Sequence, residues 1–192
     1  MKQQSSDKQQ YILNIAEAEF VRHGFKNTTI RKITVAAKMN TAMLHYYFKS
    51  KEQLFEVVLN RKLDTLTPTN LRNIPEDYNS FKELKKVVNQ HIDNAIENKA
   101  FYRLLYAEML IGDSHIISRK IREFFCSNKQ KLRQILEHGI QKKIFKPMDI
   151  DLVLVSIFGT LIHSLTKLEN DEDEVTKARI QAYFESYFNS IL

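Results

Sequence analysis

The segment Asn40–Phe55 reads NTAMLHYYFKSKEQLF, and it is the part of the chain that decides the fold. A histidine, two tyrosines and a phenylalanine stand almost side by side in it, and two lysines and a new helix start follow. Asn40 is a suitable N-cap, so the segment predicts a helix of about eight residues that ends near Tyr47. Such a helix is about 12 Å long, which matches the width of the DNA major groove.

The residues before this segment predict two further short helices. Apolar residues recur at helical spacing over residues 8–23, and Gly24 follows where a helix often ends in a left-handed residue. Either Thr28 or Thr29 can cap the second helix. Three short helices with a tight turn between the second and the third are typical of helix-turn-helix proteins.

Positive charge is concentrated in the same part of the chain. Residues 1–65 contain eleven Lys and Arg against six Asp and Glu, whereas the remaining residues contain eighteen against seventeen. A basic segment of this kind is either a solvated face or a surface that meets a polyanion, and nucleic acid is the commonest intracellular polyanion.

The third helix is expected to have one buried face and one face for DNA. Leu44 and Phe48 are four residues apart and can hold the helix against the other two, so core packing is the preferred interpretation for Phe48. The other side chains offer hydroxyl groups, apolar contacts for thymine methyl groups, and cations for phosphate. The predicted DNA-contacting residues are Thr29, Arg31, Asn40, Thr41, Ala42, Met43, His45, Tyr46, Tyr47, Lys49 and Lys51.

Residues 12–55, ILNIAEAEFVRHGFKNTTIRKITVAAKMNTAMLHYYFKSKEQLF, resemble the N-terminal DNA-binding domain of the tetracycline-repressor (TetR) family. The resemblance covers about residues 8–60. It implies a DNA-binding domain over residues 5–66 and an effector-binding and dimerisation domain over residues 67–192. The matching residues are Ala16, Phe20, Gly24, Thr28, Thr29, Ile33, Leu44, Tyr47, Phe48, Ser50, Lys51, Glu52 and Leu54.

The sequence departs from the family pattern at three positions. Thr34 stands where the family usually has alanine, and His45 stands where it usually has a tyrosine that touches the DNA backbone. Lys38 replaces the usual glycine of the turn, so a residue with a β-carbon is expected in a left-handed conformation.

The rest of the chain predicts an all-α second domain, because the whole sequence contains only four glycines and three prolines. Pro68–Asn79 is the predicted connection between the domains. Ser80 and Glu83 form a capping box that opens the next helix. The predicted helices are 80–98, 100–111, 114–125, 128–143, 151–168 and 175–191.

The last two predicted helices carry small residues at helical spacing, flanked by aromatic residues. Small residues let two helices approach closely, so we expect a four-helix dimer interface here, although ordinary packing within the chain is the alternative. The resemblance also implies a homodimer, which would present two recognition helices to a palindromic operator in double-stranded DNA. The predicted interface residues are Ser156, Gly159, Thr160, His163, Ala178, Ala182, Tyr183, Ser186 and Tyr187.

An effector cavity among the helices is implied by the resemblance, for a small molecule that the sequence does not identify. The candidate wall residues can each be explained equally well as core. They are Tyr102, Tyr106, Phe124, Phe158 and His163. The histidines lack the paired spacing of metal ligands, so neither a metal nor another cofactor is expected.

The cysteine content, the absence of targeting segments and the absence of catalytic motifs limit the classes of protein to which the sequence can belong. The single cysteine, Cys126, fits a reducing cytoplasm, and neither a signal peptide nor an apolar stretch of transmembrane length is found. No catalytic motif is present, so an enzyme is not expected. The sequence predicts a dimeric transcriptional regulator, in particular a repressor that a small molecule releases from DNA; the alternative is a helical adaptor that binds protein and no DNA.

Overall fold

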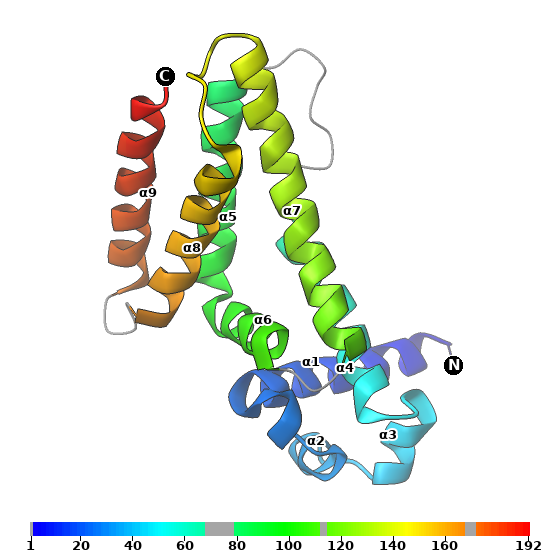
Figure 1. Ribbon diagram of the computed structural model, residues 1–192. Helices are drawn as coiled ribbons and strands as arrows, with labels where there is room; N and C mark the ends of the chain where they lie inside the picture. Colours follow the sequence, from blue (N-terminus) through cyan, green and yellow to red (C-terminus); the bar gives the residue numbers. More distant parts are fainter. Residues whose placement is uncertain (1, 68–78, 112–114, 168–171) are drawn as a thin grey trace. The chain divides into compact units, whose positions relative to one another are not determined.

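The computed structural model describes residues 2–67, 79–111, 115–167 and 172–192, which form helices joined by turns. The all-α fold is confirmed, and the predicted connection over residues 68–78 lies outside the described residues. Over the described ranges, no helix has an apolar stretch that could cross a membrane. The helices are α1 (Lys2–Asn27), α2 (Ile30–Ala36), α3 (Thr41–Tyr47), α4 (Lys51–Leu66), α5 (Ser80–Glu97), α6 (Lys99–Ile111), α7 (His115–Gln141), α8 (Ile150–Lys167) and α9 (Asp173–Ser190) (Figure 1).

The chain forms two compact units. The first unit consists of residues 1–66 and 104–122, and the second consists of residues 67–103 and 123–192. The first unit therefore contains the predicted DNA-binding domain together with a later segment that the sequence did not indicate. No turn signal marks the limits of that segment, because they fall inside helices α6 and α7.

In the first unit, α1 packs against α2 and α4, and α2 packs against α3 (Figure 1). Three phenylalanine rings form the centre of its core. The ring centroid of Phe20 lies 5.9 Å from that of Phe25 and 4.6 Å from that of Phe55, and the last two lie 5.0 Å apart. All three side chains are buried, so this cluster holds the end of α1 against α4.

The two threonines after α1, Thr28 and Thr29, make different hydrogen bonds. The hydroxyl of Thr29 accepts a hydrogen bond from the backbone N–H of Lys32 at 3.2 Å, so Thr29 is the N-cap of α2. Thr28 is buried and donates to the carbonyl oxygens of Glu19 and Gly24. Gly24 has φ of 76°, as predicted for the residue that ends the regular part of α1.

The turn between α2 and α3 also follows the sequence prediction. Lys38 has φ of 50°, the left-handed conformation expected where the family usually has glycine. The side-chain oxygen of Asn40 accepts from the N–H of Ala42 at 2.9 Å, which caps α3. Thr34 is accommodated because its hydroxyl donates to the carbonyl oxygen of Arg31 one turn earlier.

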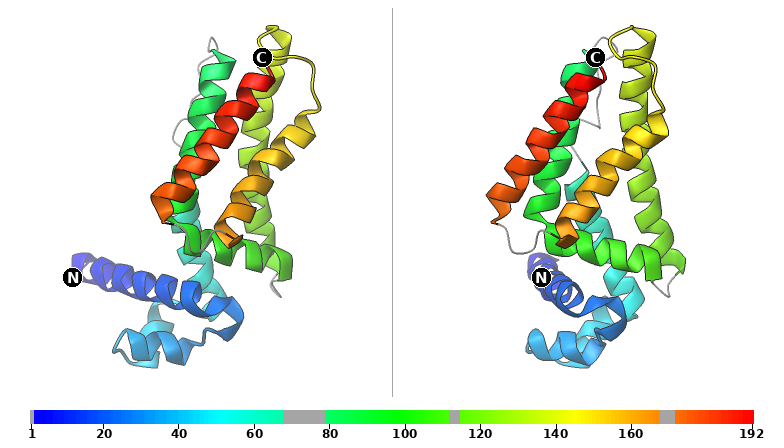
Figure 2. Two further views of the ribbon diagram at one scale, coloured as in Figure 1. Left: turned by 90° about the vertical axis from the view of Figure 1, so that its left-hand side faces the viewer. Right: turned by 60° about the vertical axis from the view of Figure 1, so that its left-hand side comes forward.

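In the second unit, α5, α8 and α9 lie side by side and pack against one another (Figure 2). Helix α9 buries Thr176, Ile180, Phe184 and Phe188, which recur every four residues and therefore lie on one face. The rings of Phe184 and Phe188 stack at 5.6 Å within this buried face.

Two predictions for the second unit are wrong. The N-cap of α5 is Asn79, whose side chain accepts from the N–H of Lys82; the predicted cap, Ser80, is buried and lies 2.7 Å from Nδ1 of His138. The two helices predicted over residues 114–125 and 128–143 are one helix, α7. The polar residues between them contain neither proline nor glycine, so nothing there ends the helix.

Candidate nucleic-acid interface

Helix α3 has one buried face and one exposed face. Leu44 and Phe48 are buried as predicted, and they fix the helix to the first unit. The exposed side chains around the rest of the helix are those of Thr41, Ala42, Met43, His45 and Tyr46. Because a helix of seven residues is about 10 Å long, the whole exposed face fits within one major groove.

The two tyrosines at the end of α3 differ in burial. Tyr46 is 82% exposed, so its ring and its hydroxyl are both accessible to a partner. Tyr47 is half-buried and its ring centroid lies 5.2 Å from that of Tyr46 in an edge-to-face arrangement. The inner ring therefore supports the outer one and limits the directions in which it can point.

The two lysines after α3 lie in different surroundings. Lys49 is exposed. The ammonium group of Lys51 instead donates to the backbone carbonyl of Phe25 at 2.9 Å and lies 4.3 Å from the centre of the Phe25 ring. This carbonyl and ring attract the cation inward, which differs from the outward orientation expected for a phosphate contact.

Residue Phe25 is also held from its other side. Its backbone N–H donates to the carboxylate of Glu108, a residue of α6 that is only 8% exposed, at 3.2 Å. The peptide groups on both sides of Phe25 are thus fixed, one by α4 through Lys51 and one by α6. Sequence reasoning did not find either contact, because the partners are far apart in the chain.

The remaining predicted DNA-contacting residues flank α3. Thr29 and Arg31 are exposed at the start of α2. Asn40 is exposed as well, but its side-chain oxygen is already used to cap α3. Together with the face of α3, these residues supply hydroxyl, thioether, imidazole, phenol and cationic groups. Such groups can contact base edges and phosphate oxygens.

The predicted dimer-interface residues belong to α8 and α9, and each of them is exposed or half-buried. Phe184 and Phe188 point into the unit, whereas Tyr183 and Tyr187 stack on each other outside at 6.2 Å with nearly parallel rings. Leu152, Val155 and Val175, which the sequence prediction did not include, are further exposed apolar residues on the same two helices. The predicted residues that are exposed are Gly159, His163, Ala178, Ala182, Tyr183 and Ser186, and those that are half-buried are Ser156, Thr160 and Tyr187.

The predicted effector residues do not all share one environment. Tyr102 is buried, which raises the pKa of its hydroxyl, and Phe124 and Phe158 are half-buried in the second unit. Tyr106 belongs to the first unit, and His163 is exposed on α8. The exposure of His163 places it on the outer face of α8 and not in the interior expected for a cavity wall.

A buried histidine of α5 was not among the candidates. His91 is 3% exposed, its ring lies 5.7 Å from that of Phe158, and burial lowers its pKa to about 4. Within the described residues its Nε2 atom has no hydrogen-bond partner. No group of three or more His, Cys, Asp or Glu that could hold a metal ion occurs in the described part of the chain.

Comparisons with known proteins agree with this geometry. Residues 12–58 match the family model "Bacterial regulatory proteins, tetR family", and residues 81–170 match "Tetracyclin repressor-like, C-terminal domain". The "Probable acrEF/envCD operon repressor" of Escherichia coli (strain K12) is 26% identical over 161 residues, which are 78% of this chain and 70% of that protein. The "HTH-type transcriptional repressor KstR2" of Mycolicibacterium smegmatis is 27% identical over 152 residues, with 78% and 74% covered. The solved structure of the ketosteroid transcriptional regulator KstR2 of Mycobacterium tuberculosis has the same fold, with a TM-score of 0.78 at 22% identity over 95% of this chain and 94% of that one.

Proposed function

The chain belongs to the tetR family of bacterial regulatory proteins and is a DNA-binding transcriptional regulator, and from this premise we propose that it is a repressor that a small-molecule effector releases from its operator. The observation that carries the proposal is the exposed face of α3, held on the first unit by two buried residues, Leu44 and Phe48. The alternative of a protein-binding adaptor gains no support from the comparisons, which match regulators of transcription.

In the proposed complex, the N-terminal part of α3 reads bases. The hydroxyl of Thr41 hydrogen-bonds a base edge or a phosphate, and Ala42 and Met43 contact thymine methyl groups. Positioning on the backbone comes from side chains around this helix, because phosphate contacts fix the register without reading sequence. The residues proposed for these phosphate contacts are Thr29, Arg31, His45, Tyr46, Tyr47 and Lys49.

We also propose that two copies associate through the outer face of α8 and α9. This face combines small exposed residues such as Gly159 and Ala182 with the exposed ring of Tyr183. A two-fold dimer has two equivalent copies of α3, so its operator in double-stranded DNA is palindromic. We also propose that the protein acts in the cytoplasm, where such an operator is accessible.

Release by an effector requires only that the effector binds one conformation of the dimer better than the other. The proposed non-binding conformation holds the two copies of α3 at a separation that does not match the two half-sites. Tyr102, Phe124 and Phe158 of the second unit remain the proposed effector contacts, because they are aromatic and at least half-buried.

Selection of bound duplexes from a random pool tests the proposed function. We expect palindromic sequences from the wild type, and a changed preference at specific base positions from Thr41→Ala and from Met43→Ala.

Lys49→Ala should weaken binding to every duplex and make the log–log salt dependence shallower by about 0.9, the value for one phosphate contact. Lys51→Ala is the matched control: because its ammonium is bound to Phe25, we expect an unchanged salt slope. No enrichment of any duplex would contradict the proposed function.

The dimer face gives a separate prediction. Ala182→Glu places a charge on the proposed interface and should weaken the dimer about tenfold or more, since burying an unpaired carboxylate costs well over 1.4 kcal/mol. Analytical ultracentrifugation over a concentration series measures the effect. Gln130→Glu adds the same charge at an exposed position of α7 and should leave the dimer unchanged. Equal association of the two variants would show that α9 is not in the interface.

A further inference from the structure

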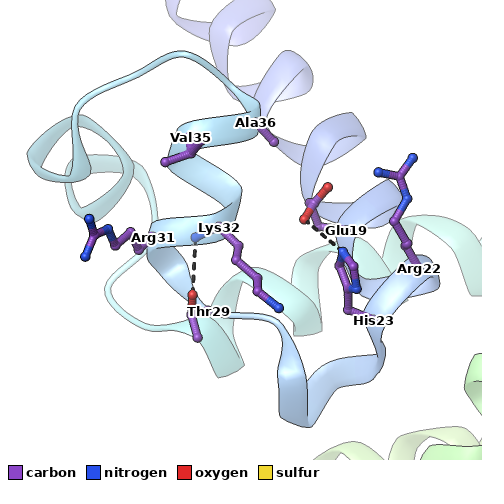
Figure 3. A pocket seen from close by; sticks show the side chains of 8 residues that line it. All are labelled: Glu19, Arg22, His23, Thr29, Arg31, Lys32, Val35 and Ala36. Carbon is purple, nitrogen blue, oxygen red and sulfur yellow. Dashed lines mark hydrogen bonds and ion pairs between the residues drawn. The ribbon is translucent and has the colours of Figure 1, made fainter.

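A groove in the first unit lies between the end of α1 and one side of α2 (Figure 3). It has a volume of about 440 Å³, and all of its lining comes from residues 19–36. Two helices and the turn between them therefore form the whole wall, and most of the lining residues are exposed, so the groove is open to solvent. The lining residues are Glu19, Arg22, His23, Thr29, Arg31, Lys32, Val35 and Ala36.

The groove carries an excess of positive charge. Three permanent cations, Arg22, Arg31 and Lys32, line it together with one carboxylate, that of Glu19. The ammonium group of Lys32 donates to the carbonyl of Asn27 at 3.0 Å. The two guanidinium groups, in contrast, have no ion pair or hydrogen bond with any residue that the structure describes. Among the described residues these two arginine side chains have no partner, so they are available to a ligand.

The chemistry of the groove fits phosphate. A guanidinium group presents a planar fork of N–H donors that binds two phosphate oxygens at once. A site for a small molecule usually buries about 70–90% of its ligand, which an open groove between two helices cannot do. An extended polyanion that passes along the groove does not need to be enclosed.

The position of the groove indicates which polyanion. Thr29 and Arg31 line the groove and also belong to the residues proposed to contact operator DNA. The groove is therefore continuous with the proposed DNA interface and extends it from α2 to α1. In Figure 3, Arg22 projects from α1 on one side of the groove and Arg31 from α2 on the other.

We propose that this groove binds a phosphodiester of the DNA backbone and that Arg22 of α1 is a phosphate contact of the regulator. The proposal rests on the proposed function, because the phosphodiester belongs to the bound duplex. Arg22 is the proposed contact on the α1 side of the groove. Arg31, whose guanidinium group points away from that of Arg22 in Figure 3, is the proposed contact to the DNA backbone on the α2 side. The carboxylate of Glu19 repels the negative charge of the phosphate. It lies 3.7 Å from Nε2 of His23. Arg22 reads no sequence, so it strengthens binding to every duplex alike.

Salt titrations of duplex binding test this contact. Fluorescence anisotropy with a selected operator and with a random duplex, each at several KCl concentrations, gives the log–log slope. We expect Arg22→Gln to make the slope shallower by about 0.9 and to weaken both duplexes by the same factor. Arg122→Gln removes the same charge from an exposed position of the first unit outside the groove, and its slope should equal that of the wild type.

A wild-type slope for Arg22→Gln, in an experiment where Lys49→Ala does make the slope shallower, would overturn the groove as a phosphate site and leave the proposed function intact. Failure of the wild type to bind any duplex would overturn both.

A substitution of opposite sign makes the test specific to the groove. Glu19→Gln removes the carboxylate that faces the phosphate, so it should tighten binding to both duplexes by roughly two- to tenfold. Unchanged or weaker binding would contradict the proposal.

Competition with inorganic phosphate at constant ionic strength separates DNA from a free anion as the ligand. Displacement of the wild type but not of Arg22→Gln, without any difference in their salt slopes, would assign the groove to free phosphate and overturn the DNA contact.

Discussion

Replacing Phe55 by alanine is expected to lower the free energy of unfolding by about 3–5 kcal/mol, because the ring is fully buried and its loss leaves a cavity between two other rings. The total free energy of unfolding of domains of this size is about 5–15 kcal/mol, so the first unit of the variant would be close to unfolding. Operator binding should be lost with it, since α3 is held on the core that Phe55 completes.

Urea unfolding followed by circular dichroism measures this change. Tyr46→Ala is the control, because it removes an aromatic ring of similar size from an exposed position of the same unit. It should change stability by no more than about 0.5 kcal/mol and weaken operator binding instead. A loss below about 1 kcal/mol for Phe55→Ala would mean that the three rings do not form the centre of the core.

Acidification should destabilise the protein through His91. Burial lowers the pKa of this histidine in the folded state to about 4, whereas in the unfolded chain it has its ordinary value of 6.5. Above pH 6.5 both states are neutral at this residue and it contributes no pH dependence. Between pH 6.5 and 4 the unfolded state binds a proton that the folded state does not, so the free energy of unfolding falls as the pH falls. The loss reaches about 3 kcal/mol near pH 4, at 1.36 kcal/mol for each pH unit.

The measurement compares urea unfolding of the wild type and of His91→Phe from pH 7.5 to 4.5. Phenylalanine keeps a ring beside Phe158 but cannot be protonated, so the variant should lose less stability than the wild type over this range. His45→Gln is the control, because it removes a histidine that is exposed and lies outside the second unit. Identical curves for the wild type and His91→Phe would show that the buried histidine is not responsible.

Features that depend on neighbouring residues could be predicted from the sequence. The cap at Asn40, the end of α3 near Tyr47 and the left-handed conformation of Lys38 are confirmed, because each is decided within one turn of the chain. The prediction at Ser80 is wrong for one local reason and one distant reason. Asn79 is an equally good cap one residue earlier, and the Ser80 hydroxyl lies close to His138, which is far away in the sequence.

Features that depend on distant residues could not be predicted. The inward position of Lys51 requires Phe25, which is 26 residues away. The groove next to α2 is lined by residues 19–36 alone, but it depends on how α1 and α2 pack together, and in the sequence Arg22 is only one more cation on a helix. Helical periodicity could have separated Tyr183 from Phe184, since only the latter falls in the four-residue repeat that α9 buries. Periodicity could not show which surface the exposed ring of Tyr183 contacts.

The discontinuity of the first unit has a consequence for its synthesis on the ribosome. The carboxylate of Glu108 binds the N–H of Phe25, and the ammonium group of Lys120 forms an ion pair with Glu56 at 2.5 Å, so the late segment 104–122 is part of the same packed body. When the first 66 residues leave the exit tunnel, these partners have not yet been made. The DNA-reading unit therefore completes its folding only after more than half of the polypeptide has been translated, and a nascent chain shorter than that has no finished unit with which to occupy DNA.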